Sequence, residues 1–163
     1  MTWNVRAKMA RRLEEHLLVQ FIHDPSPLVR QIVAERIDPV HLPAMMEDTN
    51  SSVRYTVAQR IDPNELIKML HDKSEDVRFA VAMRGPPSCL SELMNDSHSF
   101  VRIEVAALIS IDELPGMILD PDYRVRHEVA RRIQRRYLSV MALRETNPKV
   151  YSTLKQRLAL EAP

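Results

Sequence analysis

The stretch Asp48–His71, DTNSSVRYTVAQRIDPNELIKMLH, decides the fold, because the same pattern returns every 24 residues along the chain. If the aspartate that opens each copy is taken as offset zero, valine stands at offsets five and nine, arginine at six and alanine at ten. The aspartates that open the copies are Asp24, Asp48, Asp72, Asp96 and Asp120. A fixed period of this length is typical of a repeat protein and not of a domain with one central core.

The repeat frame extends toward both ends of the sequence. Val5 and Arg6 occupy matching offsets ahead of the first aspartate, and after Ala142 the frame shifts by one residue, so that Glu145 and Val150 begin a seventh, incomplete copy. We therefore expect a single repeat domain, residues 1–163. The expected units are 1–23, 24–47, 48–71, 72–95, 96–119 and 120–143, followed by a capping helix in 144–163.

Each unit carries the pattern of two short helices. Offset two holds a residue type that favours helix N-caps in five of six units, which predicts a helix beginning at offset three. Apolar residues at offsets five, nine, ten and thirteen then share one side of that helix. In Asp38-Pro39 and Asp62-Pro63 the aspartate can cap a second helix that begins with proline. The sequence leaves open whether this second helix, anchored by leucine at offset eighteen, is α or 3-10.

Helices of about ten residues are unstable alone in water, so each unit has to stack on its neighbours. Two glycines and 5% aromatic residues argue against a β-rich fold. The expected fold is an all-α solenoid of six two-helix repeats closed by a C-terminal helix.

Composition and cysteine count limit the classes of protein. No apolar run of about 18 residues exists, and the first residues carry charges, so we expect a soluble cytoplasmic protein without a membrane segment. Cys89 is the single cysteine, which excludes an intrachain disulfide and an all-cysteine metal site within this chain. Its offset is filled by mixed residue types in the other units, so a free, partly exposed thiol is expected.

The spacing D-x4-V-R-x2-V-A-x-R-x-D-P-x2-L, repeated over most of the chain, resembles the leucine-rich repeat variant family and, more distantly, HEAT-like repeats. The resemblance implies a right-handed superhelix that alternates α and 3-10 helices and serves as a noncatalytic scaffold. Some relatives carry an N-terminal cysteine cluster that binds a four-iron iron–sulfur centre. Residues 1–23 contain no cysteine, so no cofactor is expected here. The resemblance alone suggests a weaker alternative, an accessory partner of an iron–sulfur or other metalloprotein.

An arginine row at offset six runs from Arg6 to Arg126. On a helical projection this position lies on the stacking side, among the apolar offsets. We expect these arginines to pair with the offset-zero aspartate of the same unit or of the next one, and so to hold the repeats in register.

A second arginine row stands at offset twelve, at the edge of the apolar stripe, with Leu108 as its one interruption. Such an arginine can cap the last carbonyls of a helix, or it can form a stripe that contacts an acidic protein segment or nucleic acid. The members of this row are Arg12, Arg36, Arg60, Arg84 and Arg132.

The sixth unit, RVRHEVARRIQRRY, is locally basic, whereas the middle of the chain is acidic. Phosphate or nucleic-acid contact and a merely solvated surface are both consistent with this cluster. With the second row, it gives the candidate contacts for a partner or an anion: Arg12, Arg36, Arg60, Arg84, Arg131, Arg132, Arg135 and Arg136.

The sequence contains no recognisable catalytic or metal-binding motif. The six histidines share almost no offset, no zinc-type spacing occurs, and there is no glycine-rich phosphate loop. We expect no enzyme activity, no metal, no cofactor and no small-molecule substrate. The expected function is a noncatalytic protein-interaction scaffold with an unidentified protein partner, and the alternative is nucleic-acid or polyanion binding through the arginines.

Overall fold

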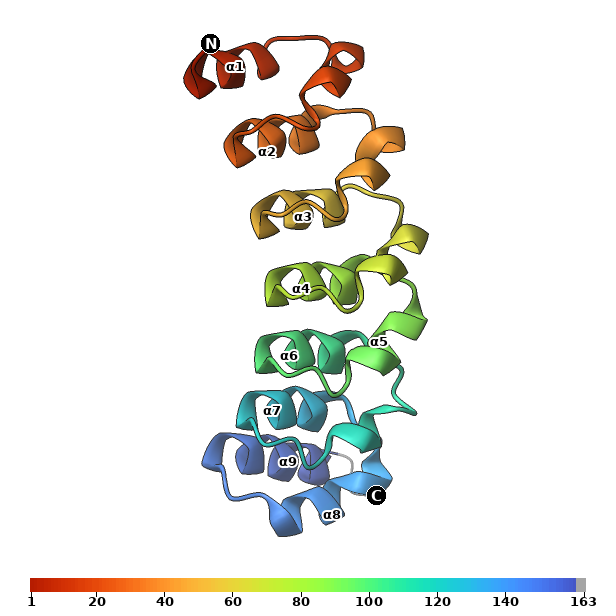
Figure 1. Cartoon of the computed structure of the whole chain (residues 1–163). Helices are drawn as coiled ribbons and strands as arrows, with labels where there is room; N and C mark the ends of the chain where they lie inside the picture. Colours follow the sequence, from red (N-terminus) through yellow and green to blue (C-terminus); the bar gives the residue numbers. More distant parts are fainter. Residues whose placement is uncertain (161–163) are drawn as a thin grey trace. The chain divides into compact units, whose positions relative to one another are not determined.

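The computed structural model describes residues 1–160, and every regular element in this part of the chain is a helix (Figure 1). The prediction of an all-α fold is confirmed. The chain forms two compact units, and the boundary lies between Pro86 and Pro87, inside the fourth repeat. One continuous domain of residues 1–163 stays a prediction, and residues 161–163 of the expected cap lie outside the described residues.

The first unit stacks four α-helices in chain order, with α1 against α2, α2 against α3 and α3 against α4 (Figure 1). A 3-10 helix, denoted η, connects each α-helix to the next. The elements are α1 (Trp3–Ala10), η1 (Glu15–Phe21), α2 (Pro27–Arg36), η2 (Pro39–Met45), α3 (Ser51–Ala58), η3 (Pro63–Met69) and α4 (Glu75–Arg84).

The second unit has the same plan with a different ending. Helix α5 packs against α6, α6 against α7, and α7 and α8 both pack against α9. The elements are α5 (Pro87–Leu93), α6 (Ser99–Leu108), η4 (Leu114–Met117), α7 (Tyr123–Arg132), α8 (Arg135–Arg144) and α9 (Pro148–Leu160). Over residues 1–160, no helix combines the length and the apolar character that crossing a membrane requires.

The first helix of every unit begins at offset three, as predicted. Side-chain capping from offset two, however, is seen only in part: Asn50 accepts from the backbone N–H of Ser52 at 3.0 Å, whereas Ser26 makes no such bond. The offset-zero aspartate binds the turn before the helix: Asp24 Oδ1 accepts a hydrogen bond from the backbone N–H of Ser26 at 2.8 Å. This aspartate therefore fixes the turn that leads into each helix.

Stacking buries the predicted apolar stripe. On α2, Val29, Val33 and Ala34 are fully buried, and so is Ile37, which directly follows the helix. In the first unit, α1 has an α-helix on one side only among the described residues. Its stacking residues Val5 and Met9 are accordingly 45% and 36% exposed.

The second helices are of both kinds. They are 3-10 helices in four repeats and α-helices in the fourth and sixth, α5 and α8. Where η2 and η3 begin, the predicted aspartate caps are present, since Asp38 accepts from the backbone N–H of Val40 at 3.0 Å and Asp62 accepts from that of Asn64 at 2.8 Å.

The expectation that Cys89 is partly exposed was wrong: the residue is only 1% exposed. Helix α5 is an α-helix, and a four-residue spacing places Cys89 and Leu93 on its buried side, while Leu90 is only partly buried. The offset-eighteen leucine is buried instead in both η2 and the α-helix α8, at Leu42 and Leu138, so packing at α5 and not helix type alone decides which residue is buried. Cys89 is a free thiol, and burial raises its pKa.

Candidate functional site

The offset-six arginines join consecutive repeats through three hydrogen bonds each. Arg30 Nε and Nη2 donate to the two carboxylate oxygens of Asp48 at 2.6 and 2.7 Å, while Nη1 donates to the backbone carbonyl of Asp24 at 2.7 Å. The carboxylate comes from the next repeat and the carbonyl from the arginine's own repeat. The predicted pairing is confirmed, with the next repeat as the source of the carboxylate.

The same bidentate contact recurs in both units, and we call it the arginine–aspartate ladder. The pairs are Arg6 with Asp24, Arg30 with Asp48 and Arg54 with Asp72 in the first unit, and Arg102 with Asp120 in the second. At the end of the second unit Arg126 binds Glu145 at 2.8 and 3.0 Å. Glu145 stands one residue later than the period requires, and its longer side chain supplies the same two oxygens.

The ladder lowers the pKa of its carboxyl groups. Hydrogen bonds from Arg6 to Asp24 and from Arg126 to Glu145 are the main cause of the lowered pKa at those two carboxyls. Burial on its own raises the pKa of Asp48 and of Asp72, but the hydrogen bonds from the arginines and from backbone N–H groups outweigh it, and the pKa of both is lowered. All four groups are therefore held as carboxylates.

The offset-twelve arginines cap helix ends. Arg60 Nη1 donates to the carbonyls of Ala34 and Ile37 at 2.7 and 2.8 Å, and these carbonyls end helix α2 of the preceding repeat. The same contact, with the carbonyls 26 and 23 residues earlier, is made by Arg36, Arg84 and Arg132. Of the two interpretations of this row, helix capping is thus visible, with the preceding repeat's helix as acceptor. Contact with a partner stays a prediction.

Replacing Arg60 by leucine, the residue that occupies this offset at Leu108, is expected to lower the free energy of unfolding by about 1.5–3 kcal/mol. Two carbonyls at the end of α2 would lose a charged donor. Urea unfolding followed by circular dichroism measures the change. Arg11→Leu is the matched control, because the Arg11 side chain is exposed and bonds to no described residue. If Arg60→Leu changed the free energy of unfolding as little as Arg11→Leu does, the helix cap made by Arg60 would not stabilise the stack.

The remaining predicted contacts are exposed. The Arg12 side chain bonds to no described residue, consistent with the lack of a described helix end in front of α1. On α7, Arg131 pairs with Glu128 at 3.1 Å. At the start of α8, Arg135 is unpaired among residues 1–160, and the Arg136 guanidinium lies 4.9 Å from the centre of the Tyr137 ring. The eight candidate residues therefore divide into helix caps and exposed cations.

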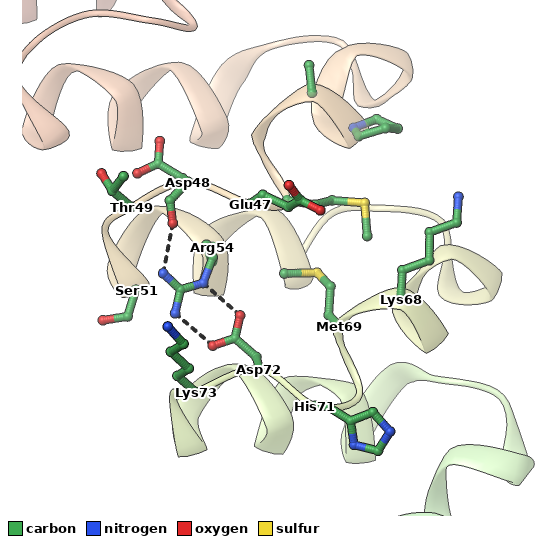
Figure 2. A pocket seen from close by; sticks show the side chains of 13 residues that line it. Glu47, Asp48, Thr49, Ser51, Arg54, Lys68, Met69, His71, Asp72 and Lys73 are labelled. Atoms are coloured by element: carbon green, nitrogen blue, oxygen red, sulfur yellow. Dashed lines mark hydrogen bonds and ion pairs between the residues drawn. The ribbon is translucent and has the colours of Figure 1, made fainter.

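An open hollow of about 1020 Å³ lies beside the ladder of the first unit. Figure 2 shows Arg54 in its wall, between Asp48 and Asp72. Two smaller hollows of the same kind adjoin Arg30 and Arg126, at about 380 and 400 Å³. The sequence reasoning missed these hollows, although the loops that join consecutive repeats, which line all three, recur at fixed offsets.

Among residues 1–160 no group of three histidine, cysteine or acidic residues could hold a metal ion. On α7 and α9, His127 Nε2 and Thr153 Oγ1 lie 3.2 Å apart, a pair that the sequence did not predict. The hydroxyl of Thr153 donates to the backbone carbonyl of Lys149 at 3.2 Å, within its own helix.

Comparison with known proteins agrees with the geometry of the stack. No model of a known protein family matches the sequence, and no curated protein matches it. A solved structure described as a leucine-rich repeat variant with a novel repetitive protein structural motif superposes with a TM-score of 0.82. The two sequences are 30% identical, and the match covers 96% of this chain and 77% of that one. The fold is a helical repeat solenoid, and the chain belongs to the leucine-rich repeat variant family.

Proposed function

We propose that this chain is a noncatalytic protein-interaction scaffold. The observation that carries the proposal is that, within each repeat, the constant residues contact neighbouring repeats and the variable residues at offsets four and eleven face solvent at least in part. The rows that stay constant from repeat to repeat are used inside the stack: the valines are buried, the offset-six arginines form the ladder and most offset-twelve arginines cap helices. Repetition thus accounts for the architecture, and recognition is left to the positions that vary.

The varying positions at offsets four and eleven form an exposed or partly exposed stripe along each first helix, whereas offsets seven and eight are partly or fully buried from α2 onward, as at Ile32 and Ala80. In the first unit this stripe is largely apolar or neutral, with Leu28 at 51% and Met83 at 49% exposure. In the second unit α7 presents Arg124 and Arg131 at these offsets, and each of them is paired with an acidic neighbour, Asp122 and Glu128 respectively. A stripe that changes chemistry between helices of equal geometry is suited to binding a protein through many shallow contacts.

A capture experiment with paired variants tests the scaffold. The purified chain is coupled to resin, and proteins retained from native lysate are identified by quantitative mass spectrometry. Their affinity is then measured by calorimetry. Leu28→Glu combined with Met83→Glu changes the α-helix stripe, and Val40→Glu combined with Ile67→Glu changes exposed apolar residues on η2 and η3.

We expect a specific partner whose affinity for the chain falls at least about tenfold with the α-helix variant. The η variant should change this affinity less than about twofold, because a substitution weakens binding only where the partner covers the substituted residue. The proposal fails if no protein is enriched over blank resin, or if both double variants bind as well as the unchanged chain.

A further inference from the structure

Helix α8 differs from the other second helices. It has ten residues where η2 and η3 have seven, and it packs on α9 with Leu138 and Met141 buried. Within the part of the chain that the structure describes, most of its other residues are exposed. Its exposed residues, which we call the α8 surface, are Arg135, Arg136, Ser139, Val140, Leu143 and Arg144.

The α8 surface is cationic and its charges are not neutralised by its neighbours. The helix contains three arginines and no acidic residue. The Arg135 and Arg144 side chains bond to no residue in the described range 1–160, and Arg136 only stacks on Tyr137. On the neighbouring helix α7, by contrast, Arg131 is paired with Glu128. The guanidinium donors of α8 are therefore available to a ligand.

The same surface is apolar between its charges. Leu143 is 86% exposed and Val140 is 52% exposed. At about 100° per residue, Leu143 lies roughly 20° from Arg136 around the helix axis, and Val140 lies between Arg136 and Arg144. Val140 and Leu143 thus lie among the arginines on one side of the helix, and together they form a mixed cationic and apolar surface that suits an amphipathic ligand.

A hollow of about 400 Å³ adjoins one edge of the α8 surface. Arg144 lines it together with Leu119, which is 67% exposed, and with the buried Met141. An apolar side chain that enters this hollow would cover Leu119 while Arg144 remains beside its mouth. The carboxylates that also line the hollow, Asp120 and Glu145, are bound by Arg102 and Arg126 of the ladder, which leaves Arg144 as its unpaired charge among the described residues.

We propose that the α8 surface binds an acidic segment of a partner protein in which carboxylates flank apolar side chains. This inference rests on the proposed scaffold function and names the chemistry of one partner. Carboxylates complement the unpaired guanidiniums in bidentate geometry, and apolar side chains complement Val140, Leu143 and Leu119. Arg136 and Arg144 are about 12 Å apart along the helix axis, a distance spanned by four extended residues.

The two other anionic partners match this surface less well. A nucleic-acid backbone supplies phosphates but no group that covers Leu143, since its affinity arises from charge. A membrane surface requires a longer helix with a continuous apolar stripe, and α8 exposes two apolar residues over ten. Both remain distinguishable outcomes of the same binding experiment.

The test uses the whole chain and fluorescence anisotropy with three labelled twelve-residue peptides. One alternates aspartate and glutamate with leucine and phenylalanine, the second replaces every acid by its amide, and the third replaces every apolar residue by serine. We expect saturable binding of the first peptide and at least about tenfold weaker binding of the other two, because both charge and apolar contact contribute. A twelve-nucleotide single-stranded RNA and phosphatidylserine vesicles are measured in parallel.

Paired variants locate the site. Leu143→Ser and Arg144→Gln are each expected to weaken binding of the first peptide about fivefold to tenfold. Val40→Ser and Lys8→Gln, at exposed positions of the first unit, are expected to change its affinity less than twofold. Thermal unfolding confirms that all four variants fold. The inference would be overturned if the first peptide does not bind, or if the control variants lose as much affinity for it as the α8 variants do. It would also be overturned if RNA or vesicles bind more tightly than the peptide and their affinity is unchanged by Leu143→Ser. The scaffold proposal would survive each of these results if the α-helix stripe still captured its partner.

Discussion

Replacing Arg54 by alanine is expected to lower the free energy of unfolding by about 3–5 kcal/mol, because the change leaves a buried carboxylate without its cation. Arg54 donates to both oxygens of Asp72 at 2.6 and 2.7 Å and to the carbonyl of Asp48 at 2.8 Å. The two side chains are only 13% and 8% exposed, so water cannot replace the lost partner fully. Urea unfolding at pH 7 measures the loss.

Two further variants test whether the loss of stability in Arg54→Ala comes from the unpaired buried carboxylate. Arg11→Ala removes an exposed arginine that is unpaired within residues 1–160 and should change stability by less than about 0.5 kcal/mol. The double variant Arg54→Met with Asp72→Asn removes both charges and should be less destabilised than Arg54→Ala alone, since no buried charge remains. If Arg54→Ala lowered the free energy of unfolding by less than about 1 kcal/mol, the ladder pair would contribute no more to stability than an ordinary surface ion pair.

Acid is expected to destabilise the protein steeply, because the ladder lowers the pKa of Asp24, Asp48, Asp72 and Glu145 in the folded chain. In the unfolded chain these groups titrate near pH 4, so there the unfolded state binds more protons than the folded state. Their contribution to stability is complete above that pH and is lost as the pH falls toward the lower folded pKa values. Each group adds up to about 1.4 kcal/mol per pH unit to the slope.

Urea midpoints measured between pH 7 and pH 2.5 test this dependence. Asp72→Asn removes one ladder carboxyl, so its stability should fall less steeply with acid than that of the unchanged chain. Asp76→Asn is the control, because Asp76 is exposed and has no partner among the described residues. Equal slopes for Asp72→Asn and the unchanged chain would show that the ladder carboxyls do not govern the acid response.

Much of the fold was predictable because its signals are local. The period of 24 residues, the start of each first helix at offset three and the burial of Val29, Val33 and Ile37 follow from helix caps and from 3.6-residue periodicity. These features depend on residues within one helix and its flanking turn. The ladder partner was predictable as a residue type for the same reason, since arginine on a stacking face requires an acid.

Which repeat supplies each partner was decided only by the tertiary structure. In a repeat protein, a contact within one repeat and a contact between neighbouring repeats have the same sequence signature. Only the arrangement of the stacked helices therefore shows that Arg30 pairs with Asp48 of the next repeat, and that Arg60 caps the carbonyls of Ala34 and Ile37 in the preceding one. The sequence also left open whether each second helix is α or 3-10, because these forms differ little in energy and packing selects between them. The packing of α5 buries Cys89, and the packing of α8 on α9 leaves the arginines of α8 exposed. By itself the sequence determined the repeat, and the packing of each repeat on the next determined which of its side chains remain free to bind.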